Sequence, residues 1–324
     1  MVQIVLIGIA AGAASALLFA SVVSGSILSV ALFYLAALPL MIAAIGWSSV
    51  AGLVAALVAA GGLAAVFGQV LLLAFLLGVG LPAWWLGYLA LLARPVAGPA
   101  GEALEWYPVG RLVVWAAILG AVVVLIAIPN FGLDADSFRG GLRRVFERVL
   151  RAQTGAADDA PLQLPGISDT GRVLDLLVVL IPPVAAVLST LTSLINLWLA
   201  GLIVRLSGRL KRPWPKISAM TFPSYAPALL ALAVAGTFLP DLIGIGSGIL
   251  SASLLVAYAL LGLAVMHALT VGINGRGFML TGTYLTLGLF GWPVLLMALL
   301  GLIETLFTLR ARLAAKRGPP PKPV

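Results

Sequence analysis

From Met1 to Ala93 this chain has no Asp, Glu, Lys, Arg or His. Soluble domains keep about a quarter of their residues charged, because water solvates ionised side chains and a hydrocarbon phase does not. Over the whole chain 9% of residues are charged, 62% are hydrophobic and the mean hydropathy is +1.16. These values predict a polytopic, all-α membrane bundle rather than a soluble fold.

Composition also excludes several kinds of chemistry. The chain has no Cys and a single His, so disulfide frameworks, thiolate nucleophiles and Cys- or His-based metal clusters are not expected. It contains no Walker A loop, no Gly-x-Ser-x-Gly and no His-Glu-x-x-His motif. We therefore predict no enzymatic activity, no cofactor and no metal. The net charge of +8 lies in short segments beside apolar runs, which favours membrane orientation over nucleic-acid binding.

A hydrocarbon core about 30 Å thick requires roughly 20 apolar residues in a helix. Stretches that meet or approach this length are Ile4–Val23, Ile27–Ile45, Ser48–Phe67, Gln69–Leu92, Arg111–Ile128, Val173–Leu206, Ala226–Leu239, Ile249–Leu269 and Phe278–Leu309. The last is too long for one upright helix, and Gly291-Trp292-Pro293 interrupts it. A Gly followed by a Pro at a helix start predicts a hairpin of two short helices there.

Charge placement predicts the orientation, because cytoplasmic loops collect Lys and Arg. The loop after Leu206 and the C-terminal tail, residues 310–324, are both basic. These two segments can lie on the same side of the membrane only if the chain crosses it an even number of times between them. Splitting the last stretch at Trp292 into two helices gives four crossings, so the condition is met. Nine to ten membrane helices follow, ten with that split, in a single transmembrane domain, residues 1–309. Both termini are then cytoplasmic, as expected of a multi-pass protein of the bacterial inner membrane.

One long segment, residues 129–172, is placed outside by this topology although it is rich in arginine. Within it, residues 134–152 place apolar side chains at helical spacing on one face, and Asp134 precedes the first turn. This pattern predicts an amphipathic helix, followed by a flexible return from Gly155 to Gly171. The residues expected to contact the membrane surface are Arg139, Arg143, Arg144, Arg148 and Arg151. The helix either lies on anionic headgroups or covers a cavity; alternatively it packs on the membrane domain and is only oriented by its arginines.

Ionisable residues inside a membrane are costly and mark candidate sites. His267 and Glu304 fall at similar depth in the predicted topology, so they are candidates for a hydrogen-bonded pair that senses protons or holds a polar headgroup. Asp241 follows Pro240 at the end of the seventh helix, where an interfacial anchor is the simpler interpretation.

Neutral polar residues form a second candidate site. Ser189 to Asn196 follow Pro182-Pro183, where two prolines should break the helical ladder and where unwound backbone often lines a cavity. A proline kink, with the polar groups bonded to neighbouring helices, is the alternative. The complete set of predicted ligand-binding residues is Asn196, Ser193, Thr192, Tyr258, His267 and Glu304.

Four short motifs in the chain are Trp106–Leu112, Ser224–Ala228, Gly262–Leu269 and Leu300–Arg310. Each resembles a stretch of the YybS-like family of uncharacterised bacterial membrane proteins. That resemblance implies a fold similar to the substrate-binding membrane subunits of energy-coupling-factor transporters. It also matches Glu304 to the acidic residue that the family has in its final helix, and His267 to the histidine of the family.

Two classes of function remain open from the sequence. The first is a module that binds or transports a small molecule or a membrane lipid, with partner subunits supplying energy. The second is a non-transporting scaffold or assembly protein that acts through the arginine-rich helix and the basic cytoplasmic loops.

Overall fold

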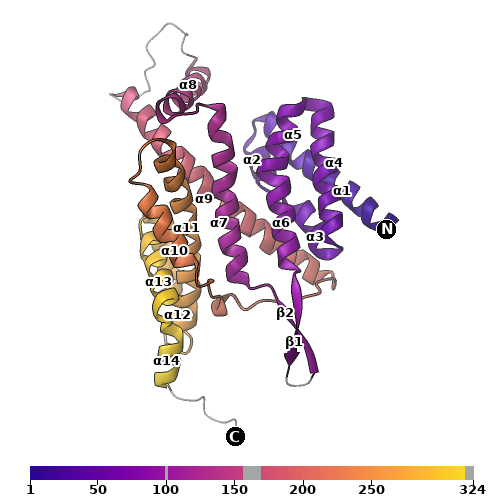
Figure 1. Cartoon of the computed structure of the whole chain (residues 1–324), viewed down its shortest axis with the longest axis vertical. Helices are drawn as coiled ribbons and strands as arrows, with labels where there is room; N and C mark the ends of the chain where they lie inside the picture. Colours follow the sequence, from indigo (N-terminus) through magenta and orange to yellow (C-terminus); the bar gives the residue numbers. More distant parts are fainter. Residues whose placement is uncertain (99–100, 156–168, 318–324) are drawn as a thin grey trace. The chain divides into compact units, whose positions relative to one another are not determined.

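A computed structural model describes residues 1–98, 101–155 and 169–317 of the chain (Figure 1). The predicted all-α, polytopic architecture is confirmed. In order, the helices of the first half are α1 Val2–Ala20, α2 Ile27–Tyr34, α3 Leu38–Gly46, α4 Ser49–Phe67, α5 Gln69–Phe75, α6 Leu81–Ala90, α7 Val109–Ala127 and α8 Ala135–Thr154. Those of the second half are α9 Thr170–Leu206, α10 Ala226–Gly236, α11 Asp241–Leu269, α12 Arg276–Phe290, α13 Pro293–Phe307 and α14 Leu309–Arg317.

Seven helical stretches are long and apolar enough to cross a membrane, counting only the described residues. They are Val2–Ser24, Ile27–Gly46, Ser49–Phe67, Gln69–Ala90, Val109–Asn130, Thr170–Leu206 and Asp241–Leu269. The helices α10, α12 and α13 are shorter than a full span. The seven long stretches agree with predicted spans, whereas the total of ten crossings remains a prediction.

The chain divides into two compact units, each described by itself. Unit 1 comprises Met1–Ala116, Leu191–Pro227 and Leu255–Val324; unit 2 comprises Ala117–Thr190 and Ala228–Leu254. The single domain predicted for residues 1–309 is not tested by this division. Residues 156–168, within the predicted return from Gly155 to Gly171, and residues 318–324 of the predicted tail lie outside the described residues.

Small residues allow the helices of unit 1 to pack closely. Ala51, Ala55 and Ala59 of α4 are completely buried where α4 packs on α1. Lipid tails are as apolar as leucine, so membrane helices gain more from close contact than from hiding apolar surface. A serine caps the start of α4, where Ser48 Oγ accepts a hydrogen bond from Ala51 N.

The predicted helical hairpin at Trp292 is confirmed. Helix α12 ends at Phe290, and α13 begins at Pro293, so the proline occupies the first turn of α13. Gly291 lies between them with φ 67°, a left-handed conformation that glycine adopts without a steric penalty. The sequence signal therefore corresponds to a real turn, and α12 and α13 lie side by side (Figure 1).

Helix α9 runs without interruption through Pro182 and Pro183, in agreement with the single stretch predicted for Val173–Leu206 and not with unwound backbone at the prolines. Each proline instead leaves one carbonyl, four residues earlier, without its intrahelical donor. One predicted boundary is wrong, at the start of α11. Helix α11 begins at Asp241 rather than at Ile249, because the glycines and serine between them remain helical.

A two-stranded antiparallel hairpin, β1 Ala93–Gly98 and β2 Gly101–Trp106, was not predicted. It connects α6 to α7, and Arg94 pairs across it with Glu105. The break predicted near Pro82 takes a mild form: a π-helical turn, Leu76–Gly80, precedes α6, and Pro82 lies in the first turn of that helix.

Helices α11 and α13 approach each other closely within unit 1. A Cβ atom added to Gly262 would lie 1.9 Å from the Met297 carbonyl oxygen, and one added to Gly301 would lie 2.2 Å from the Tyr258 carbonyl oxygen. Both obstacles are backbone atoms, so no side-chain rotation relieves them.

Gly262→Ala should therefore force α11 and α13 apart. We expect a loss of about 1–3 kcal/mol in the free energy of unfolding, the usual cost of overpacking, measured as thermal unfolding in detergent. Gly288→Ala on α12 is the matched control, since a Cβ there meets nothing within 4 Å, and it should be neutral or stabilising. Equal stability of the two variants would contradict the close crossing.

Candidate functional site

The predicted amphipathic helix is α8, Ala135–Thr154. Asp134 caps it: its carboxylate accepts hydrogen bonds from Ser137 N at 2.8 Å and Ser137 Oγ at 2.6 Å. Hydrogen bonds from the side chain and backbone of Ser137 lower the pKa of Asp134. The apolar face of α8 is buried within unit 2, where Phe138 and Leu142 pack with Val178 and Ile249. This favours the alternative in which α8 packs on the protein rather than inserting its apolar face into lipid.

The arginines of α8 lie away from that core. Arg144 and Arg148 are exposed, and Arg139 is exposed beside Asp136, 3.8 Å away. Arg143 pairs with Glu147 at 3.1 Å and also with Asp175 of α9. Arg151 also has an interaction partner. The outer face of α8 is therefore strongly basic, with Arg143 fastening the helix to α9.

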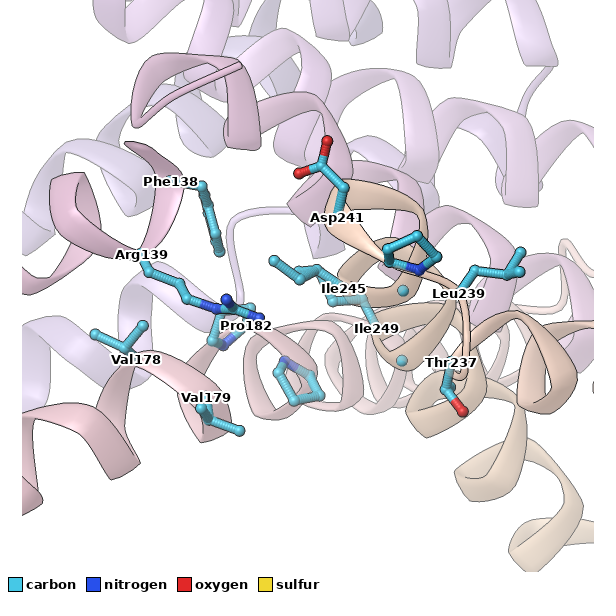
Figure 2. A pocket seen from close by; sticks show the side chains of 14 residues that line it. Phe138, Arg139, Val178, Val179, Pro182, Thr237, Leu239, Asp241, Ile245 and Ile249 are labelled. Carbon is cyan, nitrogen blue, oxygen red and sulfur yellow. The ribbon is translucent and has the colours of Figure 1, made fainter. Parts of the chain in front are cut away.

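A cavity of about 410 Å³ lies beneath α8; we call it the unit 2 cavity. Figure 2 shows Phe138 and Arg139 of α8, Pro182 of α9 and Ile245 of α11 around it. Val178 and Val179, whose carbonyls are freed by the two prolines, also line it. Asp241 closes one side: it has φ 60°, and its carboxylate accepts a hydrogen bond from Ala135 N. Asp241 is thus an anchor between α8 and α11, and the proline region does border a cavity.

Asn196 has a structural partner in unit 1. Its Nδ2 donates to Tyr34 O and Thr192 O, both at 2.8 Å. Tyr34 O is available because Leu38 N, its donor in α-helical register, bonds to Leu35 O instead. Pro39, the residue that would serve Leu35 O in that register, has no N–H. Asn196 replaces the donor that Tyr34 O lacks.

The other neutral candidates divide between helices. Thr192 and Ser193 are partly buried on α9, and neither lines a described cavity. Tyr258 is completely buried and packs edge-on against Phe222, with ring centroids 5.1 Å apart. Its hydroxyl faces Thr305 but makes no hydrogen bond of standard geometry to a described group. The structure does not gather these residues into one site.

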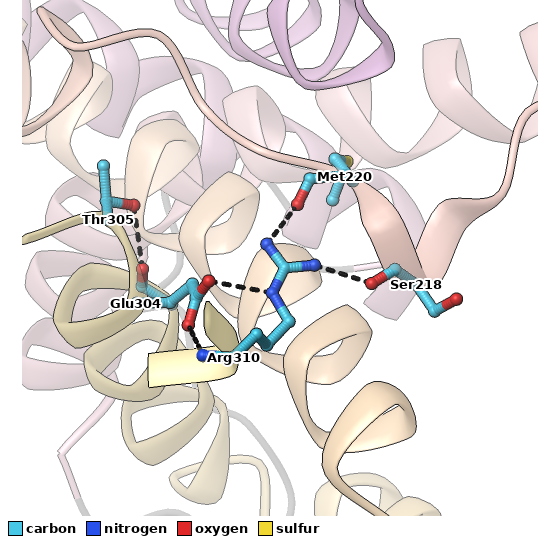
Figure 3. Close-up of polar contacts among 6 residues, drawn as sticks. Ser218, Met220, Glu304, Thr305 and Arg310 are labelled. Carbon is cyan, nitrogen blue, oxygen red and sulfur yellow. Dashed lines mark hydrogen bonds and ion pairs between the residues drawn. The ribbon is translucent and has the colours of Figure 1, made fainter. Parts of the chain in front are cut away.

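Glu304 pairs with Arg310 and not with His267 (Figure 3). Its carboxylate accepts from Arg310 Nε at 2.8 Å and from Arg310 N at 3.1 Å. The guanidinium also donates to Ser218 O at 2.6 Å and Met220 O at 2.7 Å. The two side chains are only 8% and 15% exposed. We call this group the Glu304–Arg310 clamp, because it fastens the junction of α13 and α14 to the loop after α9.

No hydrogen bond or ion pair joins His267 to Glu304 in the described part of the chain. His267 Nδ1 lies 3.0 Å from Leu263 O, and its ring lies 5.9 Å from that of Tyr284. Both His267 and Tyr284 line a second cavity.

This second cavity, which we call the unit 1 cavity, has a volume of about 690 Å³. That is within the 300–1,000 Å³ range of small-molecule sites. Its wall is predominantly apolar and is formed by one end of α7, α9 and α11, by the loop after α9 and by the start of α12. Leu194, Trp198 and Gly201 on α9 face it, whereas Asn196 on the same helix does not line it.

Arg212, in the loop after α9, is one of two arginines in this wall. It donates to Ala90 O at 2.8 Å and to Tyr107 O at 3.4 Å, while its Nε is buried without a hydrogen bond to a described group. Burial lowers the pKa of Arg212 from its ordinary value. The guanidinium is therefore held by neutral carbonyls and has no carboxylate partner among the described residues.

Arg276, the first residue of α12, is the second arginine in the wall. One of its terminal nitrogens donates to His267 O at 3.5 Å, and its Nε is also buried without a partner among the described residues. Neither Arg212 nor Arg276 was predicted as a site residue from the sequence. The one local clue was the aromatic and proline context of Arg212-Pro213-Trp214-Pro215.

No group of His, Asp and Glu that could hold a metal ion exists within the described ranges. In comparisons with known proteins, a family described as "Predicted membrane protein (DUF2232)" matches residues 13–305. Neither a curated protein nor a solved structure matches the chain.

Glu304→Gln should weaken the clamp, because it leaves Arg310 without a counter-charge in a nearly buried position. We expect a loss of about 2–3 kcal/mol in unfolding free energy, together with faster proteolysis of the tail. The control is Arg312→Gln, an exposed arginine with no described ion pair, which should change stability by less than about 0.5 kcal/mol. Equal effects would show that the clamp contributes nothing specific.

Asn196→Leu should destabilise unit 1 by about 1 kcal/mol, because the carbonyl of Tyr34 loses its donor. Thermal unfolding in detergent is the measurement, with Ser193→Ala as the neutral neighbour. A fully stable Asn196→Leu protein that no longer binds a ligand would instead restore the predicted binding role.

Proposed function

Since the chain belongs to the DUF2232 family of predicted membrane proteins, we propose that it is a membrane-embedded binding module. In this proposal the unit 1 cavity takes up an amphipathic small molecule or a lipid. The observation that carries it is the combination in one cavity of an extensive apolar wall with two arginines that lack acidic partners among the described residues. Sites for small molecules commonly combine apolar walls with a few polar groups that fix orientation.

Several observations support a binding or transport role without catalysis. The sequence has no nucleotide-binding loop, so any energy for transport would come from partner subunits. The resemblance of Gly262–Leu269 and Leu300–Arg310 to the YybS-like family, and through it to substrate-binding subunits of energy-coupling-factor transporters, agrees with this division of labour. His267, which that resemblance singles out, borders the cavity.

The proposed location is the bacterial inner membrane, with a cytoplasmic C-terminus. Support comes from contacts at one end of unit 1. Arg212 reaches Ala90 O and Tyr107 O beside the β-hairpin, Arg209 reaches Gly46 O, and Arg310 reaches the loop after α9. The basic segments therefore share one end, and Lys- and Arg-rich ends favour the cytoplasm.

A scaffold role is the second candidate, and the exposed arginines of α8 favour it. Their basic face is free of the apolar core and suits an acidic protein or an anionic lipid surface. In this alternative the basic loops recruit partner subunits and the cavity holds only bulk lipid.

Leu263→Trp should test the cavity directly. Leu263 lines it, so a larger ring reduces the space, and we expect at least a tenfold loss of any molecule that remains bound in native mass spectrometry. Leu299→Trp, exposed on α13 and outside the cavity wall, is the matched control. Unchanged ligand in Leu263→Trp, or co-purifying subunits without any ligand, would favour the scaffold alternative.

The orientation can be tested with single cysteines, since the natural chain has none. Cysteines at the exposed positions Lys211 and Arg312 should resist a membrane-impermeant maleimide in intact cells, whereas those at Ser24 and Gln153 should react. All four positions should react after the cells are permeabilised. The reverse pattern in intact cells would invert the proposed topology.

A further inference from the structure

Unit 1 is unusually poor in negative charge. Its sequence holds only three acidic residues, Glu102, Glu105 and Glu304. Glu105 pairs with Arg94, and Glu304 pairs with Arg310. Glu102 lies in the β-hairpin, opposite Ala97. None of the three lines the unit 1 cavity, so no acidic side chain of unit 1 lies in the wall beside the two arginines.

The two arginines are held in place without being neutralised. Backbone carbonyls of Ala90 and Tyr107 fix Arg212, and the carbonyl of His267 contacts Arg276. Carbonyl dipoles orient a guanidinium and offset part of its desolvation, yet the net charge stays. The Nε donor of each arginine remains unused by the described residues. A partly buried charge without an opposite charge beside it is costly, so the site is suited to an added acceptor, and a negatively charged one above all.

The rest of the wall suits a hydrocarbon chain. Arg212 follows the end of α9 at Leu206, and Arg276 follows the end of α11 at Leu269, so both arginines lie where the helices end. The apolar wall continues along α9 to Leu191 and along α11 to Leu260. At 1.5 Å per residue these positions lie about 22 Å and about 14 Å from the helix ends. The two charges thus lie beyond the helix ends, and the apolar part of the wall runs along the helices.

We infer that the unit 1 cavity selects amphiphiles with an anionic head, such as an alkyl phosphate, and that Arg212 and Arg276 bind this head while the tail lies along α9 and α11. The inference rests on the proposed function and names the class of its ligand. Basic pockets between membrane helices recognise anionic lipid headgroups in the same way, and the planar guanidinium matches the oxygens of a phosphate or carboxylate.

Tryptophan fluorescence provides the test, because Trp198 and Trp214 line the cavity. The full chain in a neutral detergent is titrated with three probes that share one bromine-labelled alkyl tail and differ in the head: a phosphate, a phosphocholine and an alcohol. Quenching that disappears in the double variant Trp198→Phe, Trp214→Phe reports on the cavity. We expect the phosphate probe to bind at least tenfold more tightly than the other two.

Variants that remove a positive charge then test which residues bind the anionic head of the probe. Arg276→Gln and Arg212→Gln should each weaken the phosphate probe at least tenfold and leave the alcohol probe unchanged. Lys211→Gln is the matched control, because Lys211 is exposed, adjacent to Arg212 and absent from the cavity wall, and it should bind normally. Arg212→Lys retains the charge and should recover part of the binding if Arg212→Gln does not fold.

The outcomes separate this inference from the proposed function. Equal binding of all three probes, insensitive to the arginine variants, would overturn the anionic selectivity and leave the binding module standing. No cavity-dependent quenching by any probe would overturn both. Displacement of the phosphate probe by inorganic phosphate at the same concentration would also overturn the inference, since the tail would then contribute nothing. Competition by two-chain phosphatidic acid would identify a membrane lipid as the natural ligand. Failure of phosphatidic acid to compete would identify a single-chain amphiphile instead.

Discussion

Inside a bilayer each backbone N–H and C=O must find its partner within the protein, and the rest of this structure follows from that constraint. Helices satisfy it locally, which is why the membrane portion is helical. After α2 the ladder is interrupted and a side chain substitutes. Leu38 N bonds to Leu35 O, and Asn196 supplies a donor to Tyr34 O from a different helix. A polar residue in the membrane thus serves the backbone before it serves a ligand.

The same constraint explains where the arginines of unit 1 reside. The last carbonyls of a helix have no partner within it, and cationic side chains near this end are favoured by the helix dipole. Arg209 reaches Gly46 O at the end of α3, Arg212 reaches Ala90 O at the end of α6, and Arg276 reaches His267 O in the last turn of α11. These arginines therefore cap helices and charge one end of the unit at once.

The sequence predicted features that depend on composition and local pattern. The long apolar spans, the hairpin at Trp292 and the capped amphipathic helix after Asp134 each have a signal within a few residues. The site does not. Glu304 meets Arg310 because Thr308 adopts a left-handed conformation, φ 49°, that turns the chain between α13 and α14, and no pattern announces a threonine in that role. Arg212 and Arg276 are far apart in sequence, and only tertiary packing brings both to one cavity.

The Glu304–Arg310 clamp has a thermodynamic consequence for that cavity. Ser218 and Met220, whose carbonyls accept from Arg310, are themselves part of the cavity wall. Docking of the segment that begins with α14 and the shape of the wall therefore share the same hydrogen bonds. Such coupling is reciprocal. A partner protein that pulls this segment away would loosen the cavity wall and change its affinity for a ligand. A ligand that stiffens the wall would change the affinity for that partner by the same factor. The segment that begins with α14 is in this sense coupled to the cavity through the carbonyls of Ser218 and Met220.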